Sequence, residues 1–296
     1  AKRGTHVLLD ARRTDYIDPD VLSLIREFKE VIGPACGVQV SLRGFRDKHD
    51  LKDDIQFVDH STRELQEQLT PEKVLHILQD GNERFRTGHR LDRDLSGQLG
   101  PHSDNQHPMA VILSGIHSAT PTELIFDLGL GDAFCIRIAG NIAGPKVIGS
   151  IEYGCQVAGA RLVVVMGNTS SMIVREAVDL VCSQRDPVEA TGCQHFGAII
   201  REIEPAIVAA DCAELVHASE RQKREFIEDV SRRNVALTVR KIVDKSSTMQ
   251  RLIETGQVAV IGAVYDLTNG RVEFMYEDAV GLEKRDPICE TASKPS

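Results

Sequence analysis

Two apolar runs of the sequence each end in a loop of small and polar residues. The first is "VILSGIHSATPTELIF", from Val111 to Phe126, with His117 near its centre. The second is "RLVVVMGNTSSMIVREAV", whose polar part spans Gly167 to Met172. Because a parallel sheet places its ligands at the carboxyl ends of its strands, these two loops are the candidate functional site. Neither loop offers an obvious nucleophile, metal-ligand cluster or acid/base pair.

A metal site is one chemistry that these residues leave open. It would combine His117 with Cys193 and His195 of "TGCQHF", since thiolate and imidazole are strong zinc ligands. The simpler interpretation is that Cys193 packs as a small apolar residue and that His195 is a surface or core histidine.

Two further chemistries are open. A serine nucleophile could act with His117 as its base, and the candidates are Ser114, Ser118 and Ser171. Residues 168–171 could instead bind an anion, because they open a helix and helix N-termini attract negative charge. We favour the simpler interpretation of the second loop, a capped and hydrated helix start.

The elements that position these loops follow an α/β pattern. Near-continuous apolar runs predict strands buried on both faces of a mainly parallel sheet: "MAVILS", "DAFCIRIAG", "RLVVVMGN" and "QVAVIGAVYD". Helical segments alternate with them, including one long helical stretch from Phe196 to Gly256. The clearest helix is predicted over Pro71–Arg86, with Thr70 as its N-cap. We therefore expect an α/β fold in which helices flank the sheet.

The chain divides into three expected parts. Residues 1–65 predict a β–α–β–α segment, in which Asp18 and Pro19 begin a helix and "DLKDDIQFV" adds a further helical turn or two. This segment is too short to bury a good core alone. Residues 66–285 form the main domain, and the polar residues 286–296 are expected to be a mobile tail.

Composition restricts the function classes. Of 296 residues, 42% are hydrophobic, and 44 acidic against 35 basic residues give a net charge of -9, which argues against nucleic acid as a partner. The seven cysteines are scattered without a CxxC pair, so we expect no disulfide framework and a reducing, cytoplasmic setting. No apolar run reaches 18 residues, the length that a membrane-spanning helix needs.

Several phrases of the main domain resemble the β-class carbonic anhydrases. They are "PTELIFDLGLGDAF", "RIAGN" and "GSIEYGCQVAGARLVVVMGN". The helix "VLHILQDGNERFRTG" resembles the helix that precedes the catalytic domain of that family, and "YDLTNGRVEF" resembles its closing strand and hairpin. The resemblance covers Leu69 to Gly281. It implies a β-carbonic anhydrase-like fold and a homodimer in which the helix Pro71–Arg86 embraces the partner.

The resemblance also implies the position of a zinc site and indicates which of its ligands this sequence lacks. Members of this family hydrate CO2 with a zinc-bound hydroxide, and a Cys on the first loop and a His and a Cys on the second hold the zinc. An Asp–Arg pair stands beside the first Cys. The first-loop positions of the Cys, the Asp and the Arg hold Gly115, His117 and Ala119. The second-loop positions of the His and the Cys hold Asn168 and Ser171, and the next glycine is Met172. We therefore expect no catalytic residue, no metal and no cofactor here.

The N-terminal part, "HVLLDARRTDYIDPDVLSLIREF", resembles the later half of a STAS domain, which follows the membrane part of SulP (sulfate permease) anion transporters. The sequence thus predicts a catalytically inactive carbonic anhydrase-like module that regulates or assembles a SulP-type anion or bicarbonate transporter. Its expected partners are a second copy and a membrane transporter domain, and its expected place is the inner face of the membrane. The alternative is an active zinc-dependent carbonic anhydrase, or a related lyase, with a rebuilt metal site.

Overall fold

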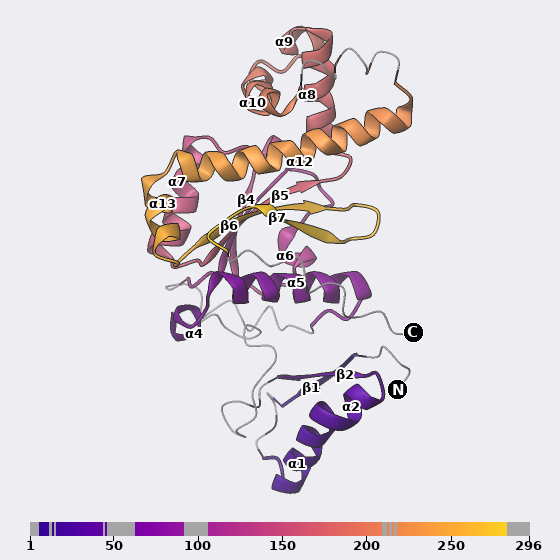
Figure 1. Ribbon diagram of the computed structural model, residues 1–296, viewed down its shortest axis with the longest axis vertical. Coiled ribbons are helices and arrows are strands. Elements are labelled where there is room, and N and C mark those ends of the chain that lie inside the picture. The colour runs from indigo at the N-terminus through magenta and orange to yellow at the C-terminus, as the bar shows by residue number, and fades with distance from the viewer. Residues whose placement is uncertain are drawn as a thin grey trace. The chain divides into compact units, whose positions relative to one another are not determined.

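The computed structural model describes residues 6–11, 14, 16–43, 45, 63–91, 106–208, 212, 215 and 218–282. The chain divides into two compact units, Ala1–His60 and Ser61–Ser296, close to the boundary expected after residue 65. Figure 1 labels the elements of both units. The expected tail at 286–296 lies outside the described residues.

The first unit contains two parallel strands and the helices between them. The strands are β1 (His6–Asp10) and β2 (Gln39–Arg43), and the connection holds α1 (Pro19–Glu27), the π-helical turn η1 (Phe28–Ile32) and α2 (Gly33–Ala35). Asp18 Oδ1 accepts a hydrogen bond from the backbone N–H of Asp20 at 2.9 Å, so α1 begins where the sequence predicted. The helical turn expected in "DLKDDIQFV" lies outside the described residues.

The second unit is built on a five-stranded sheet in the order β4-β3-β5-β6-β7. Its strands are β3 (Ala110–Ser114), β4 (Ala133–Arg137), β5 (Leu162–Asn168), β6 (Ala259–Tyr265) and β7 (Val272–Val280). All neighbours pair in parallel except β6 and β7. Every residue of β3, β5 and β6 is buried, which explains their nearly unbroken apolar sequences. The expected α/β fold is confirmed.

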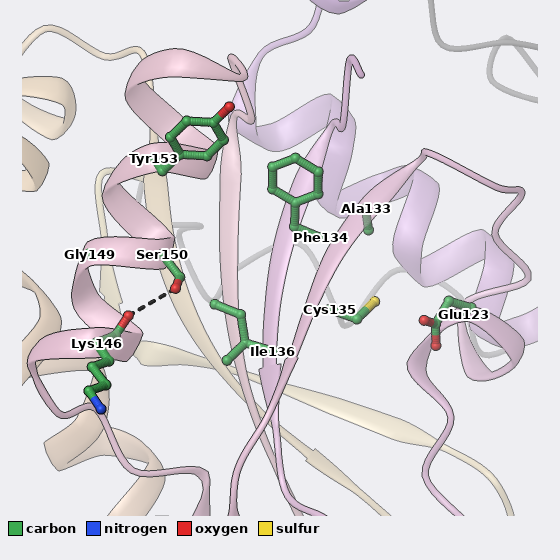
Figure 2. Close-up of a pocket in the computed structure, with 9 residues that line it drawn as sticks. All are labelled: Glu123, Ala133, Phe134, Cys135, Ile136, Lys146, Gly149, Ser150 and Tyr153. Atoms are coloured by element: carbon green, nitrogen blue, oxygen red, sulfur yellow. Dashed lines mark hydrogen bonds between the residues drawn. The ribbon is translucent and has the colours of Figure 1, made fainter. Parts of the chain in front are cut away.

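The edge strand β4 is only half-buried and borders a hollow of about 710 Å³. Figure 2 shows Phe134 and Ile136 on the side of α7 and Cys135 on the side of Glu123. Because the outer edge of β4 has no neighbouring strand in the described sheet, its backbone groups and half-buried side chains remain available there.

Helices cover both faces of the sheet (Figure 1). On one face pack α7 (Pro145–Glu152), the π-helical turn η3 (Tyr153–Val157), α12 (Glu220–Asp244) and α13 (Ser247–Glu254). On the other lie α4 (Arg63–Glu67), α5 (Pro71–Thr87) and α6 (Thr122–Ile125). The short 3-10 turn η2 (Ala139–Asn141) follows β4.

A lobe of short helices lies beyond α12 and away from the sheet (Figure 1). It contains α8 (Met172–Ser183), α9 (Pro187–Thr191), α10 (Phe196–Ile203) and the 3-10 turn η4 (Glu204–Ala206). The long helical stretch expected from Phe196 to Gly256 contains several separate helices. Pro205 lacks the N–H that would continue α10, and Ser219 with Gln222 forms a capping box that begins α12 as a new helix.

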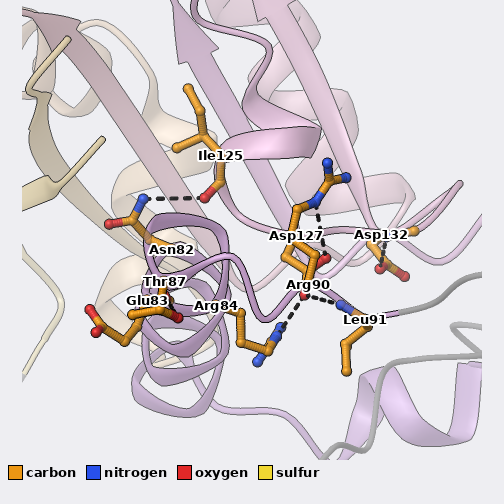
Figure 3. Close-up of polar contacts among 10 residues, drawn as sticks. Asn82, Glu83, Arg84, Thr87, Arg90, Leu91, Ile125, Asp127 and Asp132 are labelled. Atoms are coloured by element: carbon orange, nitrogen blue, oxygen red, sulfur yellow. Dashed lines mark hydrogen bonds and ion pairs between the residues drawn. The ribbon is translucent and has the colours of Figure 1, made fainter. Parts of the chain in front are cut away.

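Helix α5 is attached to its own chain by buried polar contacts (Figure 3). Asn82 is 5% exposed, and its Nδ2 donates to the carbonyl oxygens of Ile125 (3.2 Å) and Gly270 (2.9 Å). Its Oδ1 accepts from the backbone N–H of Val272 at 2.9 Å. One amide therefore joins α5 to α6 and to the β6–β7 hairpin. The expected partner-embracing arm is, in this structure, a helix packed on its own chain.

A buried carboxylate fixes the end of the same helix. Asp127 Oδ2 accepts hydrogen bonds from Arg84 Nε at 2.6 Å and from the backbone N–H of Leu91 at 3.3 Å. Arg90 Nε lies 3.9 Å from the other carboxylate oxygen. The Asp127 side chain is 1% exposed, and Arg84 satisfies most of the requirement that a buried charge be paired.

The substitution Asn82→Ala tests the contribution of this amide. It leaves two carbonyl groups and one N–H buried without partners, and we expect a loss of roughly 2–4 kcal/mol in the free energy of unfolding. Urea unfolding followed by circular dichroism measures it. Gln68→Ala, at an exposed position of the same region, is the control and should change stability by less than about 0.5 kcal/mol. Equal stability of the two variants would contradict the role assigned to Asn82.

Candidate functional site

The first candidate loop leaves β3 at Ser114 and is held by a side chain from the neighbouring strand. Arg137, the last residue of β4, is paired with Ser114 in the parallel register. Its Nε donates to the carbonyl oxygen of Gly115 at 3.3 Å, and its Nη2 donates to that of His117 at 2.6 Å. Sequence reasoning gave Arg137 no place in the site. The feature that could have indicated Arg137 is its position at the end of β4, because paired parallel strands bring the loops that follow them close together.

His117 works as a local backbone cap. Its Nδ1 accepts a hydrogen bond from the backbone N–H of Ala119 at 3.1 Å, so the neutral ring carries its proton on Nε2. Its carbonyl oxygen also accepts from the hydroxyl of Thr120 at 2.7 Å. The side chain is therefore bound within its own turn and has only Nε2 for other chemistry.

The second candidate loop joins β5 to α8. Asn168 is 6% exposed, and its Nδ2 donates to the carbonyl oxygen of Thr169 at 2.8 Å. The hydroxyl of Ser171 accepts from the backbone N–H of Val174 at 3.4 Å and caps α8. Met172 is 69% exposed. The capped helix start favoured from the sequence is thus present, and Ser171 is occupied in it.

The structure brings the two loops together. β3 and β5 are adjacent and parallel, with Ser114 opposite Met166, so both loops leave the same edge of the sheet. A Cβ atom placed on Gly115 would lie 3.8 Å from Oδ1 of Asn168, an ordinary contact distance. Position 115 therefore faces position 168 directly, and a Cβ atom at position 115 fits without a clash.

The structure does not bring together the residues of the metal site or of the serine nucleophile considered from the sequence. In the part of the chain that the structure describes, no group of three His, Cys, Asp or Glu side chains could hold a metal ion, so His117, Cys193 and His195 do not form such a group. Two of the three serine candidates, Ser114 and Ser171, have other contacts. Ser114 Oγ lies 3.5 Å from the carbonyl oxygen of Gly115, and Ser171 caps α8.

The sequence led us to expect no disulfide framework, but the structure contains one disulfide among the described residues. Cys182 on α8 and Cys212 form a disulfide, with a sequence separation of 30. The two residues pack at the apolar cluster of the lobe, where burial brings them together, and spacing along the chain could not reveal this. Cys36 and Cys193 are exposed free thiols. Burial raises the pKa of both Cys135 and Cys155 to about 12.

Comparison with known proteins identifies the family. Residues 110–272 match the carbonic anhydrase family, and the chain belongs to it. Carbonic anhydrase 2 of Mycobacterium tuberculosis is 31% identical over 203 residues, which are 68% of this chain and 91% of that protein.

Solved structures show the same fold. A Coccomyxa β-carbonic anhydrase in complex with acetazolamide is 17% identical with a TM-score of 0.50, covering 60% of this chain and 76% of that one. The β-carbonic anhydrase CafA of Aspergillus fumigatus is 20% identical with a TM-score of 0.50, covering 69% and 89%. The class of the fold is therefore that of the β-carbonic anhydrases.

Thiol labelling of the native protein at pH 8 checks the cysteine assignments. Iodoacetamide should label Cys36 and Cys193, because their thiols are exposed. Cys135 and Cys155 should stay unlabelled in the folded chain, since a pKa of about 12 leaves about one thiolate in ten thousand at that pH. Cys182 and Cys212 should be labelled only after reduction and unfolding. Mass spectrometry of the peptides measures the labelling of these six cysteines. Labelling of Cys182 without reductant would contradict the disulfide.

Proposed function

We propose that this chain is a catalytically inactive member of the carbonic anhydrase family that serves as a regulatory or assembly module. The observation that carries the proposal is the chemistry of the paired loops. Gly115, which faces Asn168 across the site, has no side chain with which to bind a metal.

The side chains at the site do not fit a zinc ion. Zinc in proteins is bound by thiolate, imidazole or carboxylate, usually with three or four protein ligands. Here Asn168 offers a neutral amide and Ser171 a neutral hydroxyl, and both make backbone hydrogen bonds. His117 is a single imidazole whose Nδ1 accepts from Ala119. Structural zinc binding is worth on the order of 10 kcal/mol, and one imidazole cannot supply it.

The alternative is an active zinc-dependent carbonic anhydrase, or a related lyase, with a rebuilt metal site. Such a site needs three protein ligands within about 2.0–2.3 Å of one point. The described residues contain no such group, and the loops are already held by Arg137, Thr120 and Ser171 without a metal. These contacts favour the inactive module.

A STAS-like role for the first unit, within a SulP-type anion or bicarbonate transporter at the inner face of the membrane, is part of the proposal. Its support is an uncovered apolar surface. None of the residues of α1 is buried, and Leu24 is 62% exposed. The two-stranded sheet of this unit pairs only along one edge of each described strand. Two strands and a helix have marginal stability alone, so we expect further structure to cover them.

No helix among the described residues has the length and apolarity to span a bilayer.

We also propose a homodimer formed through the β4 edge. The hollow beside β4 is lined by apolar side chains of the strand, among them Phe134 and Ile136, and Tyr153 of η3 at its border is 59% exposed (Figure 2). Val157, one turn further, is 65% exposed. An exposed edge strand with apolar neighbours is a surface that proteins normally cover, and self-pairing of two copies would cover both at once.

Metal analysis tests the inactive-site proposal. The purified chain should contain far less than one zinc per molecule and should not accelerate CO2 hydration. The triple variant Gly115→Cys, Asn168→His, Ser171→Cys should bind close to one zinc, because the space at position 115 accepts a Cβ and Met172 points to solvent. Inductively coupled plasma mass spectrometry measures the metal.

The matched control is Gly115→Ala, Asn168→Gln, Ser171→Thr, which adds volume at the same positions without zinc ligands and should stay metal-free. Stoichiometric zinc with CO2 hydration activity in the unmodified chain would overturn the proposal.

Sedimentation or light scattering tests the dimer. The unmodified chain should have twice the chain mass, and Tyr153→Glu should shift it to the single-chain mass, because a charge would be buried at the interface. Leu237→Glu places the same charge on α12, at a residue that is 37% exposed, and should leave the dimer intact. A single-chain mass for the unmodified protein at high concentration would reject the homodimer.

A further inference from the structure

A second hollow lies in the lobe, away from the paired loops. It has a volume of about 500 Å³ and is enclosed by the end of α8, by α9 and by α10. This volume falls in the range of sites for small organic molecules. Most of its lining residues lie between Cys182 and Cys212, so the disulfide closes the loop that carries them.

Two arginines line this hollow without a carboxylate partner. Arg185 Nε donates to the hydroxyl of Ser183 at 3.0 Å, and the described contacts give its guanidinium no acidic neighbour. Arg201 makes no hydrogen bond or ion pair with any described residue. A Cβ placed on Gly197 would lie 3.6 Å from Arg201 Nη1, so the guanidinium lies beside a residue that has no side chain.

Five other arginines of the chain have carboxylate partners. Carboxylates lie within 3.0 Å of the guanidinium groups of Arg84, Arg86, Arg221, Arg232 and Arg240. In a chain with nine more acidic than basic side chains, carboxylate partners are abundant. Two unpaired guanidinium groups at one hollow therefore leave the capacity for four or more hydrogen bonds to an anion.

The acidic residues of the hollow do not cancel this capacity. Asp186 is committed to α9, since its Oδ1 accepts from the backbone N–H groups of Val188 (2.8 Å) and Glu189 (3.0 Å). Glu204 is exposed and makes no described ion pair with either arginine. His195 also lines the hollow and adds a ring N–H donor.

The lining of the hollow is partly apolar. It includes Leu180 and Ile200, which are 2% and 5% exposed, and Pro187. A lining that combines apolar side chains with two guanidinium groups fits a molecule that has an apolar body and one strongly anionic group.

We propose that this hollow binds an organic phosphate monoester, whose charged group is held by Arg185 and Arg201. The guanidinium geometry allows two parallel hydrogen bonds to a phosphate group. The site is independent of the inactive-module proposal, because none of its residues belongs to the loops after β3 and β5.

Isothermal titration with phenyl phosphate tests the site, because this probe combines a planar apolar body with a dianion. The unmodified chain should bind it saturably, and the double variant Arg185→Gln, Arg201→Gln should bind at least tenfold more weakly. Both arginines are exposed, so the variant should unfold at the same urea concentration as the unmodified chain. The control Arg175→Gln, Arg224→Gln removes the same charge at two other exposed positions and should bind normally.

Phenol measures the apolar contribution and should bind at least tenfold more weakly than phenyl phosphate. Absence of saturable binding by the unmodified chain at low salt would overturn the proposal. So would equal weakening in the control variant, which would indicate a general charge effect, or equal binding of phenol. None of these results changes the zinc content of the chain, so the anion-site proposal and the inactive-module proposal can be rejected independently of each other.

Discussion

The parallel pairing of β3 between β4 and β5 is the constraint on which the rest of the second unit depends. It buries β3 completely and aligns Ser114 with both Arg137 and Met166. Because the three strands run in the same direction and Ser114 pairs with Arg137 and Met166 near their ends, the chain leaves all three at one edge of the sheet. The two candidate loops meet there whether or not they carry chemistry. The sheet therefore positions both loops independently of the side chains that they carry.

The loops themselves are held by contacts that need no ligand. Arg137 fixes the carbonyl groups of Gly115 and His117, and Ser171 caps α8. In a metal site the ion often fixes its loops, so that loss of the ion loosens them. Here hydrogen bonds between neighbouring strand ends perform that task.

The sequence predicted the local features well and the long-range ones poorly. Apolar runs located β3, β5 and β6, and Thr70 with Pro71 located the start of α5, because burial and capping leave marks on neighbouring residues. The facing of Gly115 and Asn168 followed from the family resemblance. The Asn82 contacts and the pairing of Cys182 with Cys212 join residues 30 or more positions apart, which only packing determines. Within the long helical stretch, Pro205 follows the end of α10, but periodicity alone does not locate the boundaries between the successive helices.

The disulfide has a consequence for the integrity of the lobe. Cys182 and Cys212 join the ends of the chain that forms α9 and α10, so this stretch is a covalent ring. A protease that cuts one peptide bond inside the ring produces two polypeptides that remain one molecule. They separate only when the sulfur–sulfur bond is reduced and the folded contacts are lost. The most peripheral helices of the second unit are thus the part that can be nicked without being shed.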